Sequence, residues 1–266
     1  MTQLRRMDPG TLCMAQTRGT IAEVVAKLGA SAAHGDRWLT GYAKNKMRLD
    51  PLYREALPLI PAGVTVLDLG CGVGLLGMLL AARAQENRTH GIEWDVIKAR
   101  FAHRMLERTA GARVVCGDVL TEPWPDCAVV AAFDILHYLP VEVQRTLLFK
   151  IGAHLPEGGR LLLRVMDSLA GGMAAVTRLC EQMAVGCGWN RAARVHWRPL
   201  RDTKRDLLAA GLVPLAARQS TGSSTGNHLL AYVKQEPSQA RGSIDLKGRA
   251  LRLDGVVPSV AGVAGP

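Results

Sequence analysis

An acidic residue followed at once by closely spaced glycines is the first feature of this 266-residue sequence that could do chemistry. Asp68 ends a short apolar, β-branched run, and Gly70, Gly72 and Gly74 precede a helical apolar pattern that begins at Leu75. This order predicts a strand, a tight turn and a helix. Glycine lets the backbone approach a ligand closely, and a helix N-terminus offers unpaired N–H groups. The turn is therefore a predicted cofactor site.

The choice of cofactor depends on Asp68. The spacing Gly72-x-Gly74-x-x-Gly77 fits the dinucleotide pattern G-x-G-x-x-G, which alone is a weak signal. A carboxylate at the strand end would lie against the pyrophosphate of a dinucleotide, whereas S-adenosylmethionine carries cationic groups and no phosphate. The stretch from Asp68 to Gly74, D-L-G-C-G-V-G, resembles the [D/E]-x-G-x-G-x-G motif of class I S-adenosylmethionine-dependent methyltransferases. The resemblance implies that S-adenosylmethionine binds at Asp68, Gly70, Cys71, Gly72 and Gly74.

Later strand ends carry residues that suit the same cofactor. Glu93 ends the second predicted strand, where an acid accepts hydrogen bonds from ribose hydroxyls in dinucleotides and in S-adenosylmethionine alike. Trp94 would lie against the adenine or cover the sheet edge. The family resemblance implies that Asp118 lies beside the adenine amino group and that the N–H of Val119 reaches the ring. Residues 128–136 form a nearly continuous apolar run, which is typical of a central parallel strand. Asp134 marks the end of this strand and is the last of the predicted cofactor residues.

Residues 134–140, D-I-L-H-Y-L-P, resemble the D-x-L-H-x-L segment of small-molecule class I methyltransferases. Because ligands bind beyond the carboxyl ends of such strands, His137 and Tyr138 are expected near the reacting methyl group. His137 is the candidate general base, with cofactor contact and packing as the alternatives. His196 is a candidate for the far wall of the pocket. No set of metal ligands is recognisable, so no metal is expected.

Residues 41–53, G-Y-A-K-N-K-M-R-L-D-P-L-Y, precede the first strand and resemble the segment that packs over the cofactor cleft as a lid in this family. Tyr42, Lys46 and Arg48 would then face the cofactor carboxylate or the substrate. The alternative is a surface helix whose basic side chains lie along it.

The pattern predicts an α/β fold, a doubly wound, seven-stranded, mostly parallel sheet of the Rossmann-like methyltransferase type with an N-terminal helical lid. We expect a lid segment over 1–60, a methyltransferase domain over 61–234 and a disordered tail over 235–266. Within these segments we expect a loosely ordered end over 1–19 and a helix over 20–33 with Thr20 and Glu23 as a capping box. Further helices are expected over 75–88, 171–186 and 195–210, and a sixth strand over 213–218.

The composition of the chain bears on its binding partners and on its location in the cell. The net charge is +10 and the pI about 9.7, but the basic residues are dispersed and are not interleaved with aromatics, which argues against nucleic acid. The six cysteines form no C-x-x-C pair, so reduced thiols and a cytoplasmic location are expected. No signal-peptide core or membrane span is recognisable.

The favoured function is methyl transfer from S-adenosylmethionine to a small-molecule acceptor, through oxygen. The patterns G-Y-x-x-x-K-x-R-L-D-P and D-x-L-H-Y-L-P resemble those of bacterial methyltransferases of aryl polyene or lipid-like biosynthesis. This resemblance implies an aromatic or acyl acceptor, either free or attached to an acyl carrier protein. The alternatives are an RNA or protein methyltransferase, a nicotinamide-dependent oxidoreductase, and a cofactor-binding subunit without catalysis. The oligomeric state stays open.

Overall fold

The computed structural model describes residues 9–30, 36–83, 85–170, 175, 179, 182–183, 194–215 and 226–235. The expected tail and most of the helix expected over 171–186 lie outside these residues.

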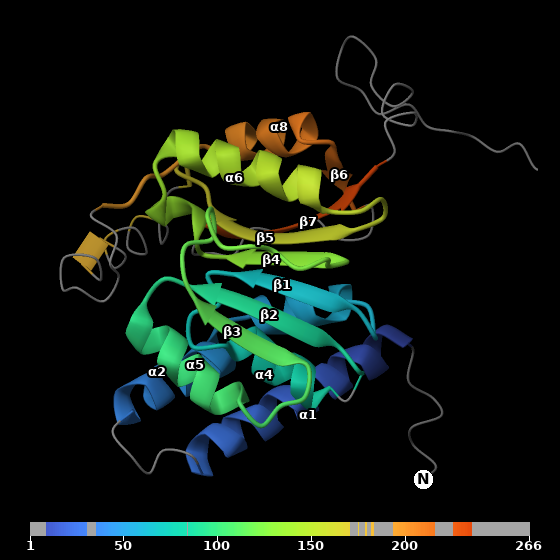
Figure 1. Cartoon of the computed structure of the whole chain (residues 1–266), viewed down its shortest axis with the longest axis vertical. Helices are drawn as coiled ribbons and strands as arrows, with labels where there is room; N and C mark the ends of the chain where they lie inside the picture. Colours follow the sequence, from blue (N-terminus) through green and yellow to red (C-terminus); the bar gives the residue numbers. More distant parts are fainter. Residues whose placement is uncertain are drawn as a thin grey trace, which may run out of the picture.

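Seven strands form one sheet in the order β3-β2-β1-β4-β5-β7-β6 (Figure 1). Strand β7 runs in the opposite direction to the other six described strands. This confirms the predicted doubly wound, mostly parallel sheet. The chain reverses its direction of progress between β1 and β4, which is the point where ligands bind in such sheets. The strands are β1 (Thr65–Leu69), β2 (Arg88–Glu93), β3 (Ala112–Cys116), β4 (Val129–Phe133), β5 (Arg160–Met166), β6 (Leu212–Pro214) and β7 (Asn227–Lys234).

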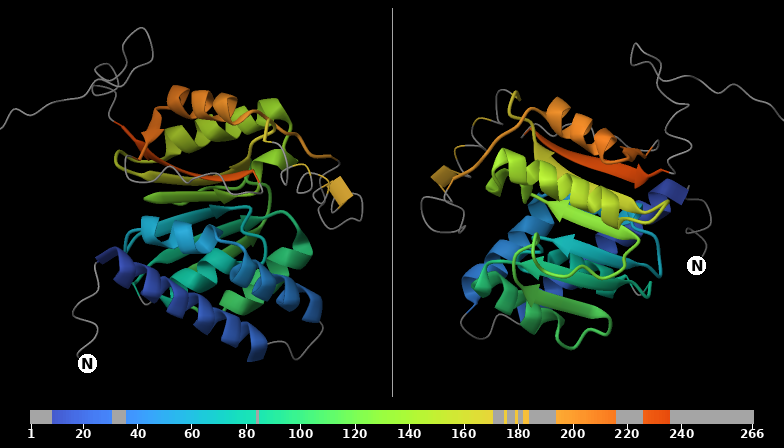
Figure 2. Two further views of the ribbon diagram at one scale, coloured as in Figure 1. Left: turned by 180° about the vertical axis from the view of Figure 1, so that it is seen from behind. Right: turned by 45° about the horizontal axis from the view of Figure 1, so that its top comes forward.

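Helices cover both faces of the sheet (Figures 1 and 2). On one face, apolar side chains of the helices that begin the chain pack with those of α4 and α5; on the other, α6 and α8 pack over a second cluster. The helices are α1 (Pro9–Ala30), α2 (Arg37–Leu49), α3 (Leu52–Ala56), α4 (Leu75–Ala82), α5 (Val96–Leu106), α6 (Val141–His154) and α8 (Leu200–Ala209), with short 3₁₀ turns η2 (Leu57–Leu59) and η3 (Leu136–Tyr138).

Central strands are apolar on both sides because both faces are covered. In β1, Val66 packs into the first cluster and Leu67 into the second, and in β4 Ala131 and Ala132 divide in the same way. Successive strand side chains point to opposite faces, so a strand buried on both faces needs an unbroken apolar run.

Two helix boundaries were predicted wrongly. The chain is already helical at Pro9, a residue whose fixed φ and missing N–H suit a first helical turn. Thr20 is therefore no N-cap: its hydroxyl donates to the Gln16 carbonyl at 3.1 Å, and Glu23 pairs with Lys27. The helix expected over 75–88 ends at Ala82, because Glu86 adopts a left-handed φ of 55° and β2 begins at Arg88.

Strand β6 ends at Pro214, earlier than the predicted range 213–218, and helix α8 lies within 195–210, the range expected to contain the last large helix. Residues 216–218 lie outside the described part of the chain. Among the described residues, no helix is both long and apolar enough to cross a membrane.

Candidate functional site

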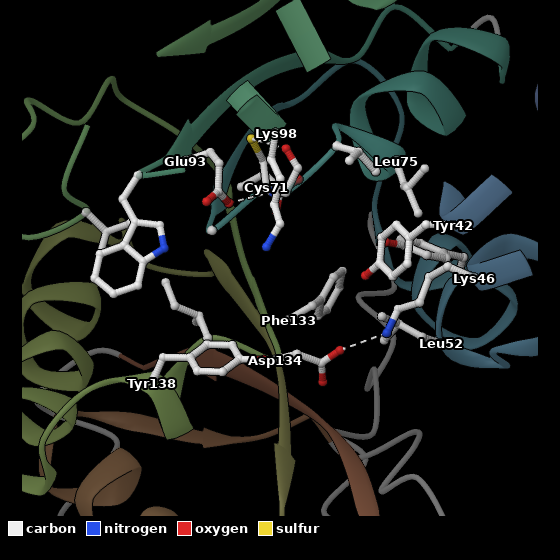
Figure 3. A pocket seen from close by; sticks show the side chains of 18 of the residues that line it. Tyr42, Lys46, Leu52, Cys71, Leu75, Glu93, Lys98, Phe133, Asp134 and Tyr138 are labelled. Atoms are coloured by element: carbon white, nitrogen blue, oxygen red, sulfur yellow. Dashed lines mark hydrogen bonds and ion pairs between the residues drawn. The ribbon is translucent and has the colours of Figure 1, made fainter. Parts of the chain in front are cut away.

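A cavity of about 380 Å³ opens where β1 and β4 end, at the point where the strand order reverses (Figure 3). Its described walls come from the glycine turn, the ends of β2 and β4, the start of α5 and the segment α2–α3. The sequence-predicted residues that line it are Tyr42, Lys46, Asp68, Gly70, Cys71, Gly72, Glu93, Trp94, Asp118, Val119, Asp134 and Tyr138.

The glycine turn after β1 needs its glycines for different reasons. Gly70 has a φ of 70°, and a Cβ there would lie 2.9 Å from Cδ1 of Ile135. Gly72 has a φ of 57° beside open space, so its backbone is accessible from the cavity. Gly74 does not line the cavity. It begins α4 with a φ of 78°, and a Cβ there would lie 2.9 Å from Cβ of Ala102 on α5.

Glu93 ties the glycine turn to the start of α5. Its Oε2 accepts from the N–H of Gly72 at 2.8 Å, and its Oε1 accepts from the N–H of Asp95 at 2.9 Å. Burial raises the pKa of Glu93 in spite of these two bonds. A carboxylate has about four acceptor sites, so the oxygens can still accept from hydroxyls of a ligand.

Asp68 is buried at the end of β1, with 5% of its surface exposed. Burial, and secondarily the charge of Glu93, raise its pKa to about 7. The two carboxylates repel each other at this end of the cavity, and a cation bound beside them would relieve this repulsion. This end of the cavity therefore favours a positively charged ligand group.

The remaining predicted cofactor residues lie where the ends of β2 and β3 meet the cavity. Trp94 is 38% exposed and lines the wall beside Glu93. Asp118 also lines the cavity, and its Oδ1 accepts from the N–H of Leu120 at 2.8 Å, so it shapes the turn after β3 as well. Val119 is buried beside it.

Asp134 is part of a four-membered ion-pair network that the sequence did not predict. Nε of Arg164, on β5, donates to Oδ1 of Asp134 at 2.6 Å, and Nη2 donates to Oδ2. Nη1 of the same guanidinium donates to both oxygens of Asp50, at 2.6 and 2.7 Å. Lys46 completes the network, with its Nζ 2.9 Å from Asp50 and 3.1 Å from Asp134.

This network fixes the charge of its members. Burial by itself would raise the pKa of Asp134, but Arg164 and Lys46 hold it far below its ordinary value. Asp134 also has a left-handed φ of 58°, which is uncommon for a residue other than glycine and costs about 1–2 kcal/mol. Asp134 is thus a fixed anion that cannot serve as a proton acceptor near neutral pH.

The two ends of α2 are held by ion pairs. Lys46 and Asp50 join its C-terminal end to β4 and β5 through the network, and Asp36, just before the helix, pairs with Arg104 of α5. Figure 3 shows Tyr42 and Lys46 facing the cavity from this helix. Arg48 does not line the cavity. It is exposed, and it lines a groove against α1 with Arg18, Lys44 and Arg54.

His137 also lies outside the cavity lining, although its neighbour Tyr138 belongs to it. The buried ring of His137 stacks on Trp197 at 4.8 Å between centroids and 22° between planes, and lies 4.1 Å from the ring of Tyr138. His196 is held beside it, since its N–H donates to the His137 carbonyl at 2.7 Å, and it does not line the cavity either.

Among the lining residues that the sequence analysis missed, Tyr53, Phe133 and Lys98 carry aromatic or charged side chains. Tyr53 on α3 and Phe133 on β4 form an edge-to-face pair with centroids 6.3 Å apart. Burial, and secondarily the charge of Asp68, raise the pKa of Tyr53. Lys98, on the first turn of α5, points into the cavity (Figure 3), and its charge partly offsets the effect of burial on the pKa of Glu93. A polar position on a helix gives no sequence signal that it faces a cavity.

The residues at the cofactor end fit S-adenosylmethionine on three counts. Asp68 and Glu93 make this end favour a cation, the oxygens of Glu93 can take ribose hydroxyls, and Gly70 and Gly72 leave space that a Cβ would occupy or strain. Within the described ranges, no three histidine, cysteine, aspartate or glutamate side chains are grouped so as to hold a metal ion.

Comparison with known proteins gives the same assignment. Residues 66–159 match the model of a family described as a methyltransferase domain. No curated protein matches the chain.

Many solved structures share the fold. One is an O-methyltransferase family 2 protein from Planctomyces limnophilus in complex with apigenin (18% identity, TM-score 0.55, 87% of this chain and 67% of that chain). A second is a TehB-like S-adenosylmethionine-dependent methyltransferase from Corynebacterium glutamicum (18% identity, TM-score 0.54, 77% of this chain and 100% of that chain). A third is the S-adenosylmethionine-dependent methyltransferase SibL in its apo form (17% identity, TM-score 0.56, 84% of this chain and 70% of that chain). At such identities these likenesses show the fold alone. The family match lies on that fold and includes the glycine turn, Glu93 and Asp134, so residues 66–159 are a methyltransferase domain with the fold of the S-adenosylmethionine-dependent enzymes.

Proposed function

We propose that this enzyme transfers a methyl group to an acidic oxygen, a phenol or a carboxylate, of a small-molecule acceptor. The observation that carries the proposal is the division of one cavity into two chemically different halves. Asp68 and Glu93 give one half an acidic wall, and Tyr42, Tyr53, Phe133 and Tyr138 give an aromatic character to the rest.

The acidic and aromatic side chains of the cofactor half each suit one part of the cofactor. S-adenosylmethionine, when bound, supplies an electrophilic methyl group. Asp68 binds and orients the ammonium end, Glu93 accepts from the ribose hydroxyls, and Trp94, Asp118 and Val119 enclose the adenine. Lys46 offers an ammonium to the cofactor carboxylate or to the acceptor. The protein's contribution is to hold the reactants in line and to exclude water.

The acceptor atom follows from the protein groups that can remove a proton. Arg164 and Lys46 keep Asp134 ionised but too weakly basic, and the ring of His137 is stacked on Trp197 outside the cavity lining. Carboxylic acids are already ionised near neutral pH, and phenols, whose pKa is about 10, lose a proton far more readily than aliphatic alcohols do. Oxygen acceptors of this kind therefore suit the described cavity best.

The aromatic lining supports a planar acceptor. Aromatic residues make up 5% of the chain, yet Tyr42, Tyr53, Phe133 and Tyr138 all line the part of this cavity outside the cofactor half. Aromatic side chains bind flat rings through offset-stacked and edge-to-face contacts. An aromatic ring with an ionisable hydroxyl or carboxyl group is the acceptor that these walls accommodate.

The test is transfer of radiolabelled methyl from S-adenosylmethionine to a panel of phenols, aromatic acids and aliphatic alcohols. The proposal expects labelled ethers or esters from the phenols and acids and none from the alcohols. Label in none of them, in a protein that binds S-adenosylhomocysteine, would instead support a cofactor-binding subunit.

A carrier-linked acceptor is a second candidate, favoured by the groove between α1 and α2. Four cations line it, Arg18, Lys44, Arg48 and Arg54, and these would attract an acidic acyl carrier protein. The same cations keep an RNA or protein acceptor as an alternative. Methyl transfer to an aryl group on a carrier protein, but not to RNA, would favour the carrier and the aryl polyene type of pathway.

A further inference from the structure

The outer face of α2 carries several large exposed apolar side chains. The helix buries Leu39, Thr40, Ala43 and Met47 against the rest of the protein. On the opposite side Trp38 is 60%, Tyr42 36% and Leu49 79% exposed. Positions 38, 42, 45 and 49 recur at helical spacing and form one stripe along the helix.

This stripe is the wall of a groove that adjoins the cavity. The groove is lined by Trp38, Gly41, Tyr42, Asn45, Lys46 and Leu49 of α2, with Arg37, Asp50, Pro51 and Asn227 around them. Tyr42 and Lys46 also line the cavity, so the groove begins where the cavity ends. The rings of Trp38 and Tyr42 are stacked 6.3 Å apart and nearly parallel, at 9°.

The apolar residues of the groove are Trp38, Tyr42, Leu49 and Pro51. Lys46, which borders both, is paired with Asp50 and Asp134, so its charge is compensated. Gly41 leaves open space on the helix surface, because a Cβ built there would meet nothing within 4 Å. A chain leaving the cavity past Tyr42 would cross Gly41 and contact Trp38 or Leu49.

We propose that the groove on α2 is an acceptor subsite that binds an extended apolar chain attached to the reacting ring. This inference rests on the proposed function, because the cavity must hold the reacting end of the same molecule. It adds a substrate class: amphiphilic acceptors in which a phenol or acid carries a long unbranched hydrocarbon tail. Burying such a tail stabilises the complex by roughly 0.8 kcal/mol per fully buried methylene, which is about a fourfold gain in affinity.

The test measures binding of ethyl, butyl, hexyl and octyl 4-hydroxybenzoate by calorimetry in the presence of saturating S-adenosylhomocysteine. Wild-type affinity is expected to rise about two- to fourfold with each added methylene. Gly41→Phe fills the groove without a clash at its Cβ, and it should abolish this dependence on chain length. Gly19→Phe is the matched control: Gly19 is an exposed helical glycine on α1, also with nothing within 4 Å, and its variant should keep the wild-type dependence.

Three binding results would overturn the subsite. These are equal chain-length dependence in wild type and Gly41→Phe, no dependence in wild type, and no binding of any ester by protein that binds S-adenosylhomocysteine. A wild-type dimer that Gly41→Phe dissociates would also overturn it, because the groove would then be an interface between two copies. Failure of the proposed function would be seen separately, as the absence of methyl transfer to every ester. The subsite would still be supported if binding depended on chain length in the wild type and in Gly19→Phe but not in Gly41→Phe.

Discussion

Arg164 donates to both carboxylate oxygens of Asp134, from Nε to Oδ1 at 2.6 Å and from Nη2 to Oδ2. The same guanidinium holds both oxygens of Asp50 at the end of α2. One buried side chain thus joins the end of β4, the middle of the sheet and the helix that carries Tyr42 and Lys46. Arg164 therefore helps to hold α2, which forms one wall of the cavity, in place.

Replacing Arg164 with Met should affect both stability and substrate binding. Two carboxylates lose their main partner, and breaking a buried pair in this way costs about 3–5 kcal/mol. Because α2 also loses its attachment, the KM for the acceptor should rise more than kcat falls. Thermal unfolding and steady-state kinetics measure the two effects.

The matched control is Arg198→Met. Arg198 and Asp206 form another buried pair, at 2.6 Å, and neither lines the cavity. This variant should lose similar stability and keep its KM. If the two variants changed KM equally, Arg164 would have only a structural role.

Asp68→Asn should weaken cofactor binding and remove its pH dependence. With its pKa raised to about 7, Asp68 in the empty protein is mostly protonated at pH 6 and ionised at pH 8. Affinity for S-adenosylhomocysteine should therefore fall about tenfold for each pH unit below 7 in the wild type, because the carboxylate must ionise to pair with the ammonium. An equally steep pH dependence in the variant would show that another group controls binding.

The same substitution should stabilise the empty protein at high pH. A carboxyl group whose pKa is raised on folding, from 3.8 to about 7, retains its proton in the folded state where the unfolded chain releases it. Wild-type stability should therefore fall as pH rises from about 4 to 7. Asp68→Asn lacks this loss, so its melting temperature should exceed that of the wild type at pH 8 and approach it at pH 4.

Gly70→Ala should abolish cofactor binding, whereas Gly63→Ala should not. Both glycines have nearly the same positive φ, 70° and 68°, so both variants pay a similar backbone cost of about 1–2 kcal/mol. Only at Gly70 would the new methyl group meet Ile135 and border the cavity. Calorimetry with S-adenosylhomocysteine separates the two effects, and equal loss of binding in both variants would contradict the close approach assigned to Gly70.

His137→Gln tests the candidate base. Because the ring packs on Trp197 outside the cavity lining, we expect reduced stability and a kcat within tenfold of the wild type. A general base contributes about 10²–10⁴-fold. A loss of that size with intact cofactor binding would mean that the ring turns into the cavity during the reaction, and His137 would regain its predicted role.

The cofactor half could be predicted because its residues follow strand ends. Asp68, Glu93, Asp118 and Asp134 each end or follow an apolar run, and parallel strands bring those ends to one edge of the sheet. All four line the cavity. Their local patterns carry enough information to place them without knowledge of distant contacts.

The acceptor half could not be predicted in the same way. Arg164 reads as one more residue of a buried strand, and its partners Asp134 and Asp50 are 30 and 114 positions away. The side on which His137 points depends on Trp197, in a segment that the pattern does not connect to it. Such contacts arise from packing between elements, which the periodicity of one segment does not record.

The central claim is that the cavity at the ends of β1 and β4 binds S-adenosylmethionine, and titration calorimetry tests it most directly. S-adenosylhomocysteine should bind the purified protein saturably with one site per chain, and Asp68→Asn should weaken that binding, while NADH should give no signal. Binding of NADH without binding of S-adenosylhomocysteine would contradict the account and would return the glycine turn to the dinucleotide pattern that Gly72, Gly74 and Gly77 also fit.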